Sequence, residues 1–234
     1  MPVFRRQSAP APRPEPSAWL PQPFGRLPFR SVKDPLIEPR WNGVRVLARA
    51  QRDPSGATTV LLTDEIGVDC TEEFVTLAQA VAAALLAEDA ILDGYLTVEA
   101  TQQSVGVMPD GPKPPTQNDI MAQAFTGRHG GQRPERKAPH DPERPIAFVA
   151  VDLLRVDGSS LVDLPLLERK RLLEGALEVG ELVRVTPFVR TPVGAQARTW
   201  FAQGFREMAY KPANGRYSPT GKPGDWATAP IRSS

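Results

Sequence analysis

Cysteine and histidine are scarce in this chain of 234 residues, and their scarcity excludes several kinds of site. The only cysteine is Cys70, so an intrachain disulfide framework and a multi-cysteine zinc site are both excluded. With only His129 and His140 as imidazole donors, a dedicated transition-metal site is not expected. The composition fits a reducing, cytoplasmic environment.

An excess of charge of one sign and long apolar runs are also missing. Lys and Arg number 28 and Asp and Glu 27, so the net charge of +1 gives no global support for nucleic-acid binding, although it is compatible with a local basic face. No apolar run reaches the roughly 18 residues of a membrane span. The arginines near the N-terminus are not followed by the apolar core of a secretion signal. We therefore expect a soluble cytoplasmic protein without a membrane anchor.

Proline is abundant, and it divides the chain. Prolines at positions 2, 10, 12, 14 and 16 predict that residues 1–18 form a flexible, extended tail, or else a ligand for a proline-reading partner. Residues 19–234 are long enough for one globular domain. The first part of this domain is predicted to dock on its surface as an extended segment through Trp19, Leu20, Phe24, Leu27 and Phe29.

Hydrophobic periodicity predicts alternating strands and helices without a regular βαβ rhythm. The expected strands are 58–62, 90–98, 145–154 and 182–189, and the expected helices are 71–85, 166–177 and 191–204. Thr71 is expected to cap the first helix, and Pro165 to open the second. The end of the domain, 208–226, carries aromatic residues among turn residues. This order favours an antiparallel-rich α+β domain.

An irregular insertion is expected at 101–145, with helical potential only at 117–125. Loops of this length without structure are usually functional or disordered. The insertion contains a basic run from Arg128 to Lys137, which includes Arg133 and Arg136. This run is interpreted either as a solvated face or as an arm that follows the phosphates of a nucleic acid.

The stretch from Leu36 to Arg45 organises the rest of the chain. Asn42-Gly43 suits a two-residue hairpin turn, and the alternation that begins at Val44 has the period of a half-buried strand. We predict a strand, a tight turn and a returning strand that together form the floor of a site.

This stretch resembles the E-x-K-W-D-G-x-R motif of ATP-dependent DNA ligases and other covalent nucleotidyltransferases. Arg40 stands at the position of the family's lysine, and Asn42 at that of its aspartate. Further blocks keep the family's order and spacing up to Trp226: 91–96 is similar to L-D-G-E-L, 148–154 to Y-x-x-F-D-L-L, and 165–169 to P-L-x-E-R. The resemblance implies a DNA-ligase-type nucleotidyltransferase fold, with antiparallel sheets flanked by helices.

The substitution at the nucleophile position has a chemical consequence. In the family, the lysine attacks the α-phosphate of ATP, which requires a deprotonated amine. The guanidinium of Arg40 stays protonated, so it can hold a phosphate but not attack it. Lys33 lies seven positions earlier, too far along an extended strand at about 3.3 Å per residue to replace it without a register change.

Other catalytic positions of the family are also substituted. An arginine of the family's S-R-x-G segment is lost within 63–67, and Glu207 lies one place away from an expected metal-binding carboxylate. The remaining positions, where the resemblance implies carboxylates or phosphate-neutralising lysines, are occupied by Tyr95, Arg206, Thr228 and Pro230. We therefore expect no catalytic residue and no metal site.

The residues that match the family preserve the shape of a pocket more than its reactivity. Gly43, Asp93 and Gly94 are framework positions. The resemblance implies residual nucleotide contacts for Glu38, Arg40, Arg45, Phe148 and Lys211. For Phe148 the alternative is an ordinary core aromatic, and for Glu38 and Arg45 it is a surface ion pair.

We interpret the chain as a ligase-like domain that has lost self-adenylylation and acts as a binding or scaffold protein linked to DNA repair and recombination. ATP and Mg²⁺ as cofactors, and DNA and repair proteins as partners, are implied by the resemblance alone. The chain ends just after the Trp226 block, so the family's C-terminal oligonucleotide-binding module is expected to be absent. The alternatives are an active ATP-dependent DNA ligase with an atypical or partner-completed site, and a structural subunit that no longer binds nucleotide.

Overall fold

The computed structural model describes residues 19–98 and 146–232, and it contains two sheets of unequal size. The larger sheet has the order β3-β2-β4-β5-β6, with β7 paired to β5. Its strands are β2 (Val44–Arg52), β3 (Thr58–Asp64), β4 (Asp89–Thr97), β5 (Ala147–Val156), β6 (Ser159–Ser160) and β7 (Val183–Val185). The smaller sheet contains β1 (Pro35–Pro39), β8 (Glu207–Pro212) and β9 (Ala227–Pro230) in the order β1-β8-β9. All pairings except β5–β7 are antiparallel, which confirms the predicted α+β fold class.

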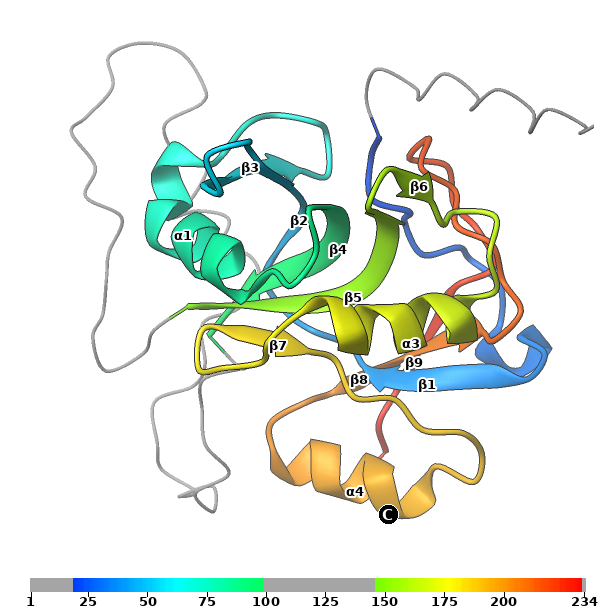
Figure 1. Cartoon of the computed structure of the whole chain (residues 1–234). Helices are drawn as coiled ribbons and strands as arrows, with labels where there is room; N and C mark the ends of the chain where they lie inside the picture. The colour runs from blue at the N-terminus through cyan, green and yellow to red at the C-terminus, as the bar shows by residue number, and fades with distance from the viewer. Residues whose placement is uncertain (1–18, 99–145, 233–234) are drawn as a thin grey trace, which may run out of the picture.

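Helices flank both sheets (Figure 1). They are α1 (Val75–Ala84), α3 (Leu166–Ala176) and α4 (Gly194–Ala202), with short 3₁₀ turns η1 (Phe29–Ser31) and η2 (Glu72–Phe74). Helix α1 packs on one face of the larger sheet, where Val46, Leu92 and Phe148 belong to one buried cluster with Val81 of the helix. Within the described part of the chain, no helix has both the length and the apolar character to cross a membrane.

The predicted hairpin at Asn42-Gly43 is wrong. Strand β1 pairs with β8 in the smaller sheet, and β2 pairs with β3 and β4 in the larger one. The residues between them carry the chain from one sheet to the other. Gly43 is required at this crossing because its φ is +146° and because a Cβ atom there would clash with the carbonyl oxygen of Leu96. The Asn-Gly sequence thus indicated a special backbone conformation, but it did not indicate which strands pair with β1 and β2.

Several smaller expectations also change. The segment 208–226, predicted as aromatic residues among turns, begins within strand β8, and a further strand, β9, directly follows it. The strand expected at 182–189 is confined to β7, followed by an isolated bridge from Val189 to Ile37. Thr71 does not cap the helix, because its Oγ1 accepts the backbone N–H of Leu62 instead. The helix opened by Pro165 is confirmed as α3.

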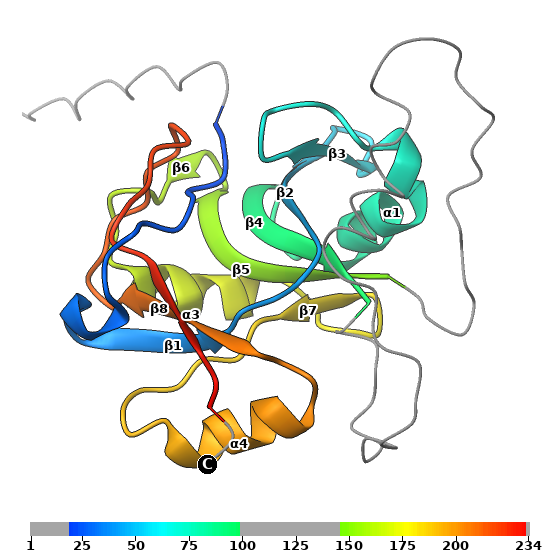
Figure 2. The same cartoon turned by 180° about the vertical axis from the view of Figure 1, so that it is seen from behind.

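An extended N-terminal strap, residues 19–26, runs beside the segment 217–226 (Figure 2). Trp19 of the strap is buried together with Leu47, Ile91 and Leu154, which lie on the face of the larger sheet away from α1. The predicted docking segment is therefore confirmed, although Leu27, just after the strap, is half exposed. The predicted tail 1–18, the insertion 101–145 and its helix 117–125 lie outside the described residues.

Candidate functional site

Arg40 directly follows β1 and interacts with Tyr95 of β4. Its Nη1 atom donates to the Tyr95 hydroxyl at 2.6 Å and to the carbonyl of Trp41 at 3.1 Å. Its backbone N–H donates to the carbonyl of Glu207, so the end of the smaller sheet fixes its position. Above the guanidinium lies the ring of Phe24, 4.5 Å from Cζ to the centroid. Arg40 is thus held by the Tyr95 hydroxyl, the Trp41 carbonyl and two aromatic rings, those of Phe24 and of Tyr95, the latter 5.4 Å from Cζ to its centroid.

A buried hydrogen-bond chain lies next to this pair. Arg45 of β2 donates twice to Asp93 of β4, at 2.9 and 2.6 Å. The Tyr217 hydroxyl donates to the same carboxylate at 2.7 Å and accepts the backbone N–H of Gln22 at 2.8 Å. Burial of Tyr217 and its contact with Asp93 raise its pKa well above 10.0. Burial alone would lower the pKa of Arg45, but Asp93 and the neighbouring tyrosines outweigh it and raise that pKa. These hydrogen bonds connect the strap to strands β2 and β4 of the larger sheet.

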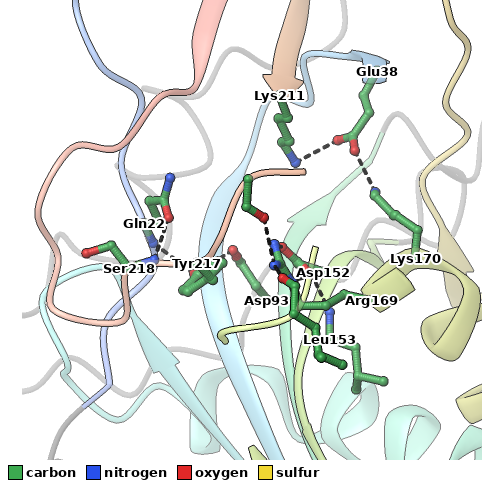
Figure 3. Close-up of polar contacts among 12 residues, drawn as sticks. Gln22, Glu38, Asp93, Asp152, Leu153, Arg169, Lys170, Lys211, Tyr217 and Ser218 are labelled. Atoms are coloured by element: carbon green, nitrogen blue, oxygen red, sulfur yellow. Dashed lines mark hydrogen bonds and ion pairs between the residues drawn. The ribbon is translucent and has the colours of Figure 1, made fainter. Parts of the chain in front are cut away.

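Glu38 of β1 forms a second buried charge cluster with two lysines (Figure 3). Lys211 of β8 donates to Oε2 at 2.7 Å. Lys170 of α3 lies 2.6 Å from Oε1, an ion pair whose angles fall outside hydrogen-bond geometry. Burial lowers the pKa of Lys170, and the positive charge of Lys211 adds to the effect, against the attraction of Glu38. Two buried ammonium groups therefore share one carboxylate.

A third buried pair joins α3 to β5. Arg169 donates to both carboxylate oxygens of Asp152 at 2.8 Å, and neither side chain is exposed. Such a bidentate geometry fixes the helix against the strand. Arg169 and Lys170 are consecutive on α3, so the same turn of helix supplies cations to both clusters.

The structure also places the remaining predicted site residues. Arg206 donates to the carbonyls of Phe201 and Phe205 at the end of α4. Thr228 and Pro230 lie in β9, opposite Ala209 and Glu207 of β8.

Phe148 is fully buried in the cluster with α1 and packs on Gly94, on the other face of the sheet from Tyr95. Lys33 is exposed before β1. Arg128, Arg133 and Arg136 lie outside the described residues. Among the residues that the structure does describe, no group of three or more metal-ligating side chains is present.

The family-model comparison decides which family this architecture represents. The model of the ATP-dependent DNA ligase domain matches residues 28–227, most of the chain. The chain belongs to this family. A curated relative is the DNA ligase of Thermococcus fumicolans, 26% identical over an alignment of 204 residues that covers 84% of this chain and 34% of the relative. The chain thus spans about a third of that ligase's length.

Solved structures of DNA ligases share the fold. The ligase domain of LigD from M. tuberculosis has a TM-score of 0.56 at 22% identity and covers 89% of this chain and 57% of its own. A mycobacterial DNA ligase D in complex with ATP and MES has a TM-score of 0.54 at 22% identity and covers 89% and 58%. A Lig E DNA ligase, studied for DNA binding with a minimal scaffold, has a TM-score of 0.50 at 9% identity and covers 92% and 68%. At these identities, the likeness supports the fold alone.

Three residues that contribute to these pairs and clusters were not predicted from the sequence: Lys170, Phe24 and Gln22. Lys170 had a usable signal, because it lies four residues after Leu166 and three before Leu173, both buried on the same face of α3. The contact of Phe24 with Arg40 and the contact of Gln22 with Tyr217 had none, because each joins residues far apart in the chain. Sequence spacing alone does not determine such contacts.

Proposed function

We propose that this chain is a non-catalytic DNA-ligase-type domain, one that binds nucleotide phosphates or DNA as a scaffold in DNA repair and does not adenylylate itself. The observation that carries the proposal is the hydrogen bond of 2.6 Å between Arg40 and Tyr95. By the family resemblance, Arg40 stands in place of a lysine nucleophile and Tyr95 in place of an acidic residue. A guanidinium that donates to a tyrosine hydroxyl stabilises structure, whereas the nucleophile of a phosphoryl-type transfer needs an available lone pair.

The acidic groups of the cluster support the same conclusion. Glu38, Asp93 and Asp152 are each held by buried cations at 2.6–2.9 Å. A carboxylate that is engaged in this way has little capacity left for a divalent cation. Tyr95 and Arg206 stand where the resemblance implies further acidic ligands. The described residues therefore do not fit Mg²⁺.

The capacity to hold an anion is nevertheless retained. A guanidinium has five N–H donors, and Arg40 uses only Nη1 in the hydrogen bonds recorded within 19–98 and 146–232. It forms no ion pair with a carboxylate in these ranges. Such a side chain suits a phosphate oxygen. The link to DNA rests on the family and on the ligase relatives.

Adenylylation is tested directly with α-labelled ATP and Mg²⁺, followed by intact-mass measurement. We expect no label and no mass gain of one AMP, with the M. tuberculosis LigD ligase domain as the positive control.

A gel-shift assay with nicked duplex DNA tests the binding role, and binding is expected to weaken in the Arg40→Met variant. Replacement of Arg128, Arg133 and Arg136 by alanine tests whether the insertion contributes. A covalent adenylate on this chain would refute the proposal.

One observation favours the alternative, an active ligase with an atypical nucleophile. The pKa of Lys170 is lowered chiefly by burial, and a lysine with a depressed pKa is the type that acts as a nucleophile. Its contact with Glu38 and its exposure of 1% oppose this role. If the chain does become labelled, the Lys170→Arg and Lys211→Arg variants identify which amine carries the adenylate.

A further inference from the structure

Phe24 of the N-terminal strap covers the guanidinium of Arg40. Its ring centroid lies 4.5 Å from the Arg40 Cζ, 5.9 Å from the Arg45 Cζ and 5.7 Å from the ring centroid of Trp226. A flat aromatic group therefore already lies between two cations and an indole. These neighbours attract the face or edge of any aromatic ring, not only that of phenylalanine.

The backbone of the strap is held on both sides of Phe24. The N–H groups of Leu20, Gln22 and Gly25 donate to the Pro219 carbonyl, the Tyr217 hydroxyl and the Trp226 carbonyl, at 2.8, 2.8 and 2.7 Å. The Gln22 side chain in turn accepts the N–H of Ser218 (Figure 3). The strap is thus fixed as a main-chain element along 217–226.

The Phe24 side chain is less constrained than this backbone. Trp19, Tyr217 and Trp226 in the same cluster are buried, whereas Phe24 is only partly buried. Rotation about χ1 would move the ring away from Arg40 without breaking any of the three backbone hydrogen bonds. Rotamer changes of partly exposed side chains are fast. The contact between Phe24 and Arg40 can therefore open while the strap stays in place.

We infer that Phe24 is an internal ligand that closes a nucleotide-binding slot over Arg40, and that a phosphorylated nucleotide displaces its ring. The ligand combines the two features that the slot offers. Its base replaces the Phe24 ring beside Trp226, and its phosphate takes the free donors of Arg40. Both a free nucleotide and the 5′-phosphorylated end of a DNA strand have this chemistry. The inference rests on the proposed function, since it concerns the same arginine, but it adds the gating residue.

The test compares the Phe24→Ala variant with the wild-type chain in equilibrium binding. The ligands are ATP without Mg²⁺ and a short single-stranded DNA with or without a 5′-phosphate. Removal of the ring should tighten binding of the preferred ligand by about 3- to 30-fold, the contribution of one cation–π contact. If ATP responds, the ligand is a free nucleotide; if only the 5′-phosphorylated strand responds, it is a DNA end.

Matched variants separate gating from general disturbance. Phe29→Ala removes a ring that packs on Tyr210, 4.9 Å between centroids, and not on Arg40, so binding should be unchanged. Phe24→Tyr keeps the ring and should bind like the wild type. The arginine-selective reagent phenylglyoxal gives a readout without ligand, because the reactivity of Arg40 should rise several-fold in Phe24→Ala and not in Phe29→Ala.

Failure of the gate is distinguishable from failure of the proposed function. Equal affinity and equal Arg40 reactivity in Phe24→Ala and wild type would overturn the gate and leave the binding role in place. If neither protein binds either ligand, the gate and the proposed nucleotide-binding role both fail. Neither result bears on self-adenylylation, which the labelling experiment decides. If Phe24→Ala does not fold, Phe24→Leu takes its place: leucine keeps apolar packing for the strap but removes the cation–π contact that holds the ring over Arg40, so the same tightening of binding is expected.

Discussion

At the scale of single residues, the buried charges of the candidate site satisfy one another. Arg45 is paired with Asp93, and Glu38 is shared by Lys170 and Lys211. Buried charges are tolerated only in such arrangements, and removal of one partner leaves another charge without compensation. The polar interior of this domain is therefore sensitive to single substitutions.

Glu38→Gln is expected to destabilise the fold strongly at neutral pH. The change leaves two buried ammonium groups without a carboxylate, at a cost of about 3–5 kcal/mol in the free energy of unfolding. Glu38 also raises the pKa of Lys170 against the effect of burial. Without this carboxylate, the pKa of Lys170 falls further below 10.5. Between the folded pKa and 10.5 the unfolded chain binds more protons, so stability rises with pH and the cost of the substitution shrinks. Urea denaturation at pH 7 and pH 9.5 measures both effects.

Glu168→Gln provides the matched control, because Glu168 lies on α3 and pairs with Arg171 in an exposed contact. An exposed pair contributes little, so its loss should change stability by less than about 1 kcal/mol at either pH. Equal effects of the two substitutions would contradict the role assigned to the buried cluster.

The chemistry of individual residues was more predictable from the sequence than their contacts. The position of Arg40 within a motif indicates what it cannot do, because that follows from the guanidinium itself. Its contacts with Tyr95 and Phe24 depend on how the two sheets and the strap pack together, and no local sequence pattern determines this packing. Lys170 was not predicted to be buried, since a lysine on an amphipathic helix is usually exposed.

At the scale of elements, strands β4 and β5 approach each other closely at Gly94. A Cβ atom at this position would lie 2.6 Å from Phe148 Cζ and 2.7 Å from the Val149 carbonyl oxygen. Neither neighbour has room to move, because both residues are fully buried. Gly94→Ala is thus expected to lower the free energy of unfolding by about 1–3 kcal/mol through overpacking. Chemical denaturation measures the change.

Gly175→Ala is the opposite case and the natural control. Gly175 lies inside α3, and nothing lies within 4 Å of the Cβ that the substitution adds. Alanine should stabilise the helix by about 0.4–1 kcal/mol, since it reduces the entropy of the unfolded chain. If both glycine substitutions shift stability in the same direction, close strand packing is not what requires Gly94.

Local turn chemistry determined which elements could be predicted. Asp157 and Gly158 both have positive φ and join β5 to β6, as their sequence indicates, and Pro165 precedes α3. Asn42-Gly43 gave a similar signal, but there the chain leaves one sheet for another. The strand β8 was missed because its partners β1 and β9 come from distant parts of the chain. Elements with local causes were predictable, and those that depend on distant pairing were not.

At the scale of the whole molecule, the candidate site is formed jointly by both sheets, α3 and the strap. Glu38 and Arg40 come from the end of the smaller sheet, Arg45 and Tyr95 from the larger one, and Lys170 from α3. Phe24 then covers Arg40 from the strap. The properties of this site therefore depend on the assembly of these elements, and we expect that a single substitution does not convert it into a ligase active site.

Arg40→Lys tests this claim, because it restores the amine that the family motif has at this position. We expect no covalent AMP on the variant after incubation with ATP and Mg²⁺, as measured by intact mass. By the family resemblance, a lone amine would still lack the carboxylate expected at Tyr95 and the cations expected at Thr228 and Pro230. Each missing electrostatic contact of this kind typically costs about 10²–10³ in rate. A mass gain of one adenylate from this single change would mean instead that the rest of the site is competent and that Arg40 alone blocks the reaction.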